Sequence, residues 1–89
     1  MSWTDKKALK VINKIRDLYR IEDFVETGTF KGINALTQSK NFKRVLTCEH
    51  NPEYAAIAQS KLRGSPNVVI YQLDSPTFLK TYKLYRAIS

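Results

Sequence analysis

Three short β-prone runs, each carrying an acidic residue at its end, constrain the fold of this chain more than any other feature. The runs and their acids are residues 24–27 with Glu26, residues 44–49 with Glu49, and residues 68–74 with Asp74. Helix-length segments separate the runs, which predicts right-handed crossovers between parallel strands. We therefore expect an α/β chain with a parallel sheet of about three strands and flanking helices.

Helical patterns surround these runs. Residues 4–20 place apolar side chains at helical spacing among lysines, with Thr4 as a candidate N-cap. A second helix is predicted over residues 32–40 and ends at Asn41. All 89 residues are expected to form a single domain, residues 1–89, because no linker, repeat or low-complexity tract interrupts the alternation.

Two further helices are predicted to begin with a polar capping residue followed by a proline. Asn51 precedes a proline, as in a capped helix start, and Gly64 is expected to close that helix in the left-handed conformation. Ser75 repeats the cap-then-proline pattern and starts the last helix, which is predicted to run to the C-terminus.

The chain carries an excess of positive charge, and its basic residues are spread along the sequence. The chain has 15 Lys and Arg against 8 Asp and Glu, a net charge of +7. Such an excess suits nucleic acid or an acidic membrane surface. The basic residues are scattered without a run of three, which favours a solvated basic surface. Nucleic-acid binding thus stays open without being favoured, and no membrane partner is expected.

The cysteine and histidine content limits the kinds of site that the chain can form. The single cysteine, Cys48, lies in an apolar run and is interpreted as a small buried residue. One histidine, His50, is too few for a zinc set, so no metal site is predicted. The sequence has neither a signal peptide nor an apolar stretch near 18 residues, so a cytoplasmic protein is expected.

The turn after the first run has the composition of a ligand-binding loop. Residues 25–32 read VETGTFKG, so Gly28 and Gly32 stand four apart just beyond Glu26. Glycines let the backbone approach a ligand, and in parallel sheets ligands bind beyond the carboxyl ends of the strands. The negative charge of Glu26 disfavours binding of a pyrophosphate. Phe30 takes the position of the middle glycine of a dinucleotide-binding loop, so both residues argue against a dinucleotide ligand.

From about residue 22 to about residue 79 the chain resembles the cofactor-binding half of class I S-adenosylmethionine-dependent methyltransferases. ETGTFKG fits their acidic, Gly-rich E/D-x-G-x-x-x-G turn, CEHNPEY fits the acidic end of their second strand, and QLDS fits the end of their third strand. The resemblance implies a three-layer Rossmann-like fold, here truncated to about three strands. It also implies S-adenosylmethionine as cofactor.

The resemblance assigns roles to three acids. Glu49 would accept hydrogen bonds from both ribose hydroxyls, Asp74 would lie beside the adenine amino group, and Glu26 would help to hold the ammonium of the amino-acid part. The full set of expected cofactor-binding residues is Glu26, Thr27, Gly28, Thr29, Phe30, Gly32, Glu49, His50, Asp74 and Ser75.

Structural alternatives stand beside these roles. Glu26 and Glu49 could be ordinary strand ends, and Asp74 belongs to an Asp-Ser-Pro sequence that is also a helix-capping signal. Phe30 and Tyr54 suit packing as well as ligand contact. Tyrosines of the last helix could stack bases, although packing in the core or in an interface is favoured.

The resembled family continues through four more strands, with the acceptor site beyond the fourth. No catalytic residue can therefore be named here. We expect either a fragment of a longer methyltransferase or a reduced protein that completes its sheet as a homo-oligomer, through the exposed first strand or its flanking helices. Three functions follow: a methyltransferase or its cofactor-binding portion, a non-catalytic nucleoside-binding subunit, or a small basic nucleic-acid-binding protein.

Overall fold

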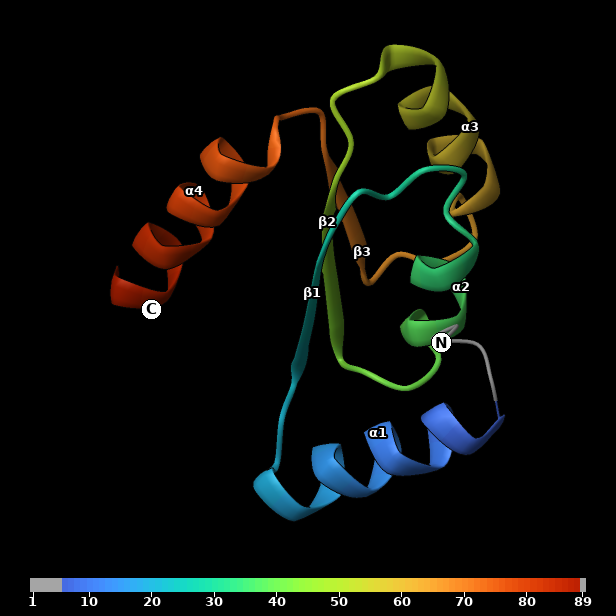
Figure 1. Ribbon diagram of the computed structural model, residues 1–89, viewed down its shortest axis with the longest axis vertical. Helices are drawn as coiled ribbons and strands as arrows, with labels where there is room; N and C mark the ends of the chain where they lie inside the picture. The colour runs from blue at the N-terminus through green and yellow to red at the C-terminus, as the bar shows by residue number, and fades with distance from the viewer. Residues whose placement is uncertain (1–5, 89) are drawn as a thin grey trace.

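The computed structural model describes residues 6–88 and alternates helices with strands (Figure 1). The elements are α1 (Lys6–Tyr19), β1 (Asp23–Thr27), α2 (Ile33–Ser39), β2 (Arg44–Cys48), α3 (Pro52–Lys61), β3 (Val68–Tyr71) and α4 (Ser75–Ile88). The predicted cap Thr4 lies outside the described residues.

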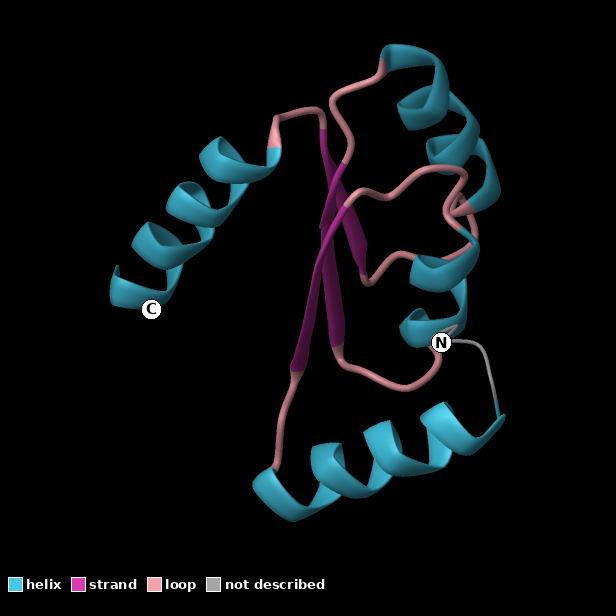
Figure 2. Ribbon diagram, in the orientation of Figure 1, coloured by secondary structure: helices cyan, strands magenta, loops and turns pink. Residues whose placement is uncertain are grey.

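The three strands form one parallel sheet in the order β1-β2-β3 (Figure 2). The register places Phe24 beside Val45, and Val45 beside Val68. In Figure 1, α2 and α3 lie on one side of the sheet and α4 on the other. The expected α/β architecture with parallel strands and flanking helices is thereby confirmed, with β1 at one edge of the sheet.

The larger core lies between the sheet and the helices α2 and α3. Its buried members are Ala35, Phe42, Val45, Ala58 and Leu62. Phe24 packs there, with its ring centroid 5.2 Å from that of Phe42. Helix α1 joins this core through Ile12 and is also held by Arg16, whose guanidinium donates to the carbonyl of Asn41 over 2.7 Å.

A smaller core lies on the face covered by α4. Leu46, Cys48 and Phe78 are buried there, and Tyr82 packs against them. The prediction that Cys48 is a buried apolar residue is confirmed, because only 1% of it is exposed. Packing also accounts for Tyr82, one of the two tyrosines for which base stacking was the alternative.

Two predicted helix ends differ from the structure. Helix α3 ends at Lys61, with the amide of Leu62 bonded to the carbonyl of Ala58, and Gly64 does not take the left-handed conformation. The helix closes without a positive φ because its last amides bond within its own final turn. At α4 the N-cap is Asp74, whose carboxylate accepts from the amide of Thr77, whereas Ser75 is already helical.

Gly32, just before α2, has a left-handed φ of 85°. The residues around it leave no room for a side chain. A Cβ at this residue would lie 3.3 Å from the Cα of Ala58 and 3.2 Å from the side chain of Leu62, so the missing side chain lets α2 pack against α3. Both the backbone conformation and the close approach therefore require glycine here.

We expect Gly32→Ala to lower the free energy of unfolding by about 1–3 kcal/mol, because it adds left-handed strain and a steric contact. Gly64→Ala is the matched control, since a Cβ there meets nothing within 4 Å. It should be neutral or stabilising by up to about 1 kcal/mol. Urea denaturation measures both. Equal stabilities of the two variants would contradict this account of Gly32.

Candidate functional site

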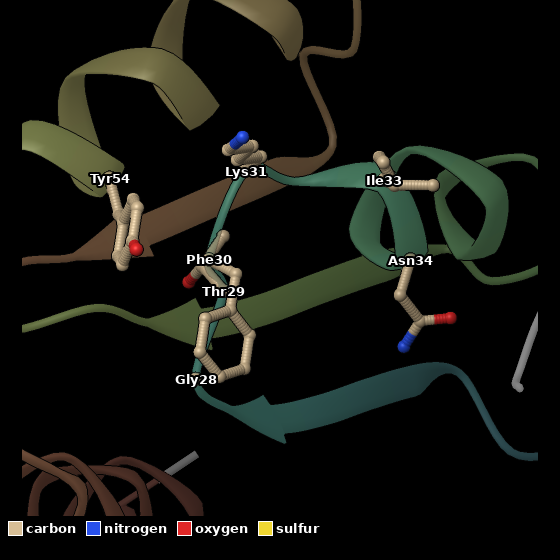
Figure 3. A pocket seen from close by; sticks show the side chains of 7 residues that line it. All are labelled: Gly28, Thr29, Phe30, Lys31, Ile33, Asn34 and Tyr54. Carbon is tan, nitrogen blue, oxygen red and sulfur yellow. The ribbon is translucent and has the colours of Figure 1, made fainter.

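A cavity of about 380 Å³ opens beside the turn that follows β1 (Figure 3). The residues that line it come from this turn and from the starts of α2 and α3: Gly28, Thr29, Phe30, Lys31, Ile33, Asn34 and Tyr54. It lies beyond the carboxyl ends of the strands, where parallel α/β sheets bind their ligands.

The turn is a series of left-handed residues fixed by backbone hydrogen bonds. Gly28 and Gly32 have φ values of 82° and 85°, and Phe30 has a φ of 50°. The amides of Gly28 and Thr29 both donate to the carbonyl of Cys48, over 3.0 and 2.9 Å. Positive φ is natural for the glycines but strained for Phe30, at a cost of about 1–2 kcal/mol.

Glu49 fastens this turn to the start of α3. Its Oε1 accepts from the amide of Phe30 over 2.8 Å, and its Oε2 accepts from the amide of Asn51 over 3.1 Å. Only 4% of Glu49 is exposed. Hydrogen bonds to a carboxylate are among the stronger ones in proteins, so Glu49 also has a structural role. A carboxylate offers about four acceptor positions, which leaves it further acceptor capacity.

Glu26 lies at the centre of a second polar network. Its Oε2 accepts from the amide group of Asn34 over 2.8 Å, and its Oε1 accepts from the hydroxyl of Thr47 over 2.9 Å. Thr29, which is 4% exposed, shares a 2.6 Å hydrogen bond with the same Thr47 hydroxyl. Burial raises the pKa of Glu26, against the lowering effect of its two hydrogen bonds.

Asn34 links this network to the cavity. Its side chain lines the cavity, and its Oδ1 is buried without a hydrogen-bond partner among the described residues. A buried amide oxygen without a donor is costly. Asn34 thus brings an unpaired amide oxygen to the cavity wall, with the Glu26 carboxylate directly behind it.

Two aromatic rings flank the cavity. The ring centroids of Phe30 and Tyr54 lie 6.2 Å apart in an edge-on arrangement. The ring of Phe30 lies over Gly28, where an added Cβ would be 3.2 Å from it (Figure 3). Phe30 is nevertheless 64% exposed, so contact with a ligand would add apolar burial that the protein alone does not supply.

Of the predicted cofactor-binding residues, only Gly28, Thr29 and Phe30 line the cavity. Glu26 and Glu49 lie outside the lining and bond to its members Asn34 and Phe30, and Gly32 packs against α3. His50 is an exposed side chain whose Nδ1 lies 3.9 Å from Oε2 of Glu49. Asp74 caps α4, and the hydrogen bond from the Thr77 backbone lowers its pKa. Ser75 is the first residue of α4, and Thr27 is exposed at the end of β1. The capping alternative for Asp74 is therefore present in the structure.

Four lining residues were missing from the predicted set: Lys31, Ile33, Asn34 and Tyr54. Lys31 lies within the turn, and its sequence position alone could have included it. Asn34 follows Glu26 by eight residues, and the hydrogen bond between them depends on how the turn folds back. Periodicity carries no signal for such a contact.

Residues 6–88 contain neither a metal site nor a membrane-spanning helix. No group of three or more His, Cys, Asp or Glu side chains in this range is arranged to hold a metal ion. Within the same range, every helix is too short or too polar to cross a membrane.

Comparison with known proteins supports the fold. No protein-family model matches the chain, and no curated protein sequence is significantly similar to it. The crystal structure of the 23S rRNA methyltransferase ErmE superimposes with a TM-score of 0.61 at 24% identity, over 79% of this chain and 29% of that one. The chain thus shares the Rossmann-like fold of part of a methyltransferase, as the resemblance implied, and spans less than a third of its length.

The raised pKa of Glu26 predicts how stability depends on pH. Because the folded-state pKa lies above the ordinary value of 4.5, the folded protein binds more protons than the unfolded chain between these two values. Glu26 should therefore make the free energy of unfolding fall as pH rises through this window. Glu26→Gln should remove this part of the fall, as measured by urea denaturation from acidic to neutral pH.

Glu53→Gln, a change of an exposed acid in the first turn of α3, is the matched control and should keep the wild-type pH dependence. If the free energy of unfolding had the same pH dependence in wild type and in Glu26→Gln, burial would not raise the pKa of Glu26.

Proposed function

We propose that this chain binds S-adenosylmethionine or S-adenosylhomocysteine and serves as the cofactor-binding part of a methyltransferase. The observation that carries the proposal is the glycine turn with left-handed residues, fastened by Glu49 and placed beside Glu26 at the carboxyl end of a parallel sheet. The similarity of fold to a methyltransferase supports it.

The amino-acid part of the cofactor suits the wall formed by the turn and Asn34. The ring of Phe30 occupies the space that a side chain on Gly28 would fill, and Glu26 lies directly behind Asn34. A partly desolvated carboxylate gains more from a nearby cation than a solvated one does. An ammonium, bound directly or through Asn34, would therefore lower the pKa of Glu26 towards its ordinary value.

The nucleoside part suits the side of the cavity near Glu49. The unused acceptor positions of this carboxylate could take the ribose hydroxyls, and the exposed rings of Phe30 and Tyr54 offer apolar contact area. Glu49, His50 and Asp74 all lie outside the cavity lining, so these contacts with ribose and adenine would require the ligand to extend beyond the cavity.

When bound, the cofactor supplies a methyl group on a sulfonium centre. The residues described here bind and orient this group, and their contribution to rate comes from alignment of the two reactants. None of them is assigned as a general base. Activity of a whole protein is an extension of the proposal, because the chain spans 29% of the matched methyltransferase.

A subunit that binds the cofactor without chemistry is the alternative. It has the same cavity, so cofactor binding does not separate the two functions. Turnover of labelled S-adenosylmethionine in the presence of candidate acceptors does, since only a methyltransferase transfers the label.

We expect calorimetry to detect binding of both cofactor forms at the wild-type site. Glu26→Gln should weaken binding of S-adenosylmethionine about tenfold, because the amide lacks the negative charge that attracts the ammonium. Glu49→Gln should also weaken binding, and circular dichroism must show that its turn is still folded. Glu53→Gln is the exposed control and should bind as the wild type does.

Absence of heat from either ligand on a folded wild-type protein would refute the proposed function. Binding that is unchanged in Glu26→Gln would instead refute the role of Glu26 and leave the cofactor in place.

The basic character of the chain gives a separate expectation. Because the positive charges are dispersed, we predict weak, sequence-independent binding to RNA or DNA, with Kd on the order of 10⁻⁴ to 10⁻⁶ M at physiological salt. Filter binding across a salt series measures it. A tight, sequence-selective complex would favour the nucleic-acid-binding function over cofactor binding.

A further inference from the structure

The outer edge of β1 carries backbone groups that no strand of residues 6–88 pairs with. The carbonyl of Glu22 and the amide of Gly28 bond towards β2. Because the amide and carbonyl of successive residues in a strand alternate in direction, those of Asp23, Val25 and Thr27 point away from β2. The sheet order ends at β1 on this side, so these three residues form an open edge.

A buried acceptor lies at the same edge. Only 7% of the Asp23 side chain is exposed. Its Oδ1 accepts from the guanidinium of Arg44 over 2.6 Å, whereas its Oδ2 has no hydrogen-bond partner among the described residues. A buried carboxylate oxygen without a donor costs free energy. The site is therefore incomplete, and what it lacks is a hydrogen-bond donor.

Space for such a donor lies beside Asp23. A cavity of about 320 Å³ is bounded by the connection from α1 to β1 and by α4, with Asp23, Tyr19 and Tyr82 in its lining. In Figure 1, α4 stands apart from the end of α1, and no strand covers β1 on this side. A polypeptide strand is the ligand that would satisfy the open backbone groups and the side-chain oxygen together.

We propose that a second copy of this chain supplies that strand, and that two β1 edges pair antiparallel about a two-fold axis at Val25. In this register Val25 faces Val25 of the second copy, and Asp23 faces Thr27 of the second copy. All outward-pointing amides and carbonyls of the three residues then find partners. A pairing centred on Glu26 would instead oppose two carboxylates, and one centred on Phe24 would oppose Glu26 to Glu22.

The same register also supplies the hydrogen-bond donor that the Asp23 carboxylate lacks. Side chains directly opposite each other in an antiparallel pair lie on the same face, so the Thr27 hydroxyl of one copy comes to the Asp23 carboxylate of the other. Thr27 is exposed, which leaves its hydroxyl available as a donor. The two-fold axis forms this hydrogen bond twice.

Apolar surface near the strand adds area to the contact. Leu18, Tyr19 and Ile21 precede β1 and are 72%, 71% and 40% exposed. A five-residue edge alone is smaller than a stable interface requires, whereas an edge with flanking apolar side chains approaches it. Two copies of net charge +7 repel, so salt should strengthen the dimer, whereas it weakens binding to nucleic acid.

Residue-resolved amide exchange tests the pairing directly. At low protein concentration the amides of Phe24 and Glu26 should be protected by β2, while those of Asp23, Val25 and Thr27 exchange quickly. At high concentration all five should be protected. Persistence of the alternating pattern in a dimer would place the interface elsewhere, and a monomer throughout the accessible concentration range would refute the proposal.

Thr27→Val tests the Asp23 contact, because valine keeps the shape and strand propensity and removes the hydroxyl. Sedimentation should show a dimer Kd at least about tenfold weaker than wild type, from two lost hydrogen bonds. Thr37→Val is the matched control, since this hydroxyl bonds to the carbonyl of Ile33 within α2 and does not belong to the β1 edge. A Kd unchanged in Thr27→Val, or weakened equally in Thr37→Val, would overturn the register.

Discussion

The carboxylate of Glu49 is the contact on which the candidate site depends. It joins the amide of Phe30, in the turn after β1, to the amide of Asn51, which caps α3. Residues far apart in the sequence are thereby held at one end of the sheet. Because the carboxylate is buried, replacing it by an apolar side chain would leave two amides without acceptors, and the turn would lose the geometry that opens the cavity.

The sheet and its helices could be predicted from the sequence because their signals are local. The β-prone runs, the proline after Asn51 and the acids at the strand ends each indicate an element without knowledge of the others. Helix ends were less predictable. Gly64 looked like a left-handed cap, but α3 closes through the amide of Leu62. Ser75 resembled a cap, but Asp74 one residue earlier supplies the acceptor.

The candidate site could be predicted only in part, in its composition as well as in its geometry. Gly28, Gly32 and Glu49 follow from a contiguous motif and a strand end. The hydrogen bond of Glu26 to Asn34, and that of Thr29 to Thr47, join different elements and arise only when the turn folds over β2. The position of Glu49, His50 and Asp74 outside the cavity lining and the exposure of the Phe30 ring have no signal in the sequence.

Phe30 links the backbone strain of the turn to the shape of the cavity. Its backbone is strained at a φ of 50°, and its exposed ring shelters Gly28. Glycine at this position would relieve the strain, yet it would also widen the cavity and remove an aromatic surface. The same substitution therefore acts on stability and on ligand selectivity at once, so selection for one property alters the other.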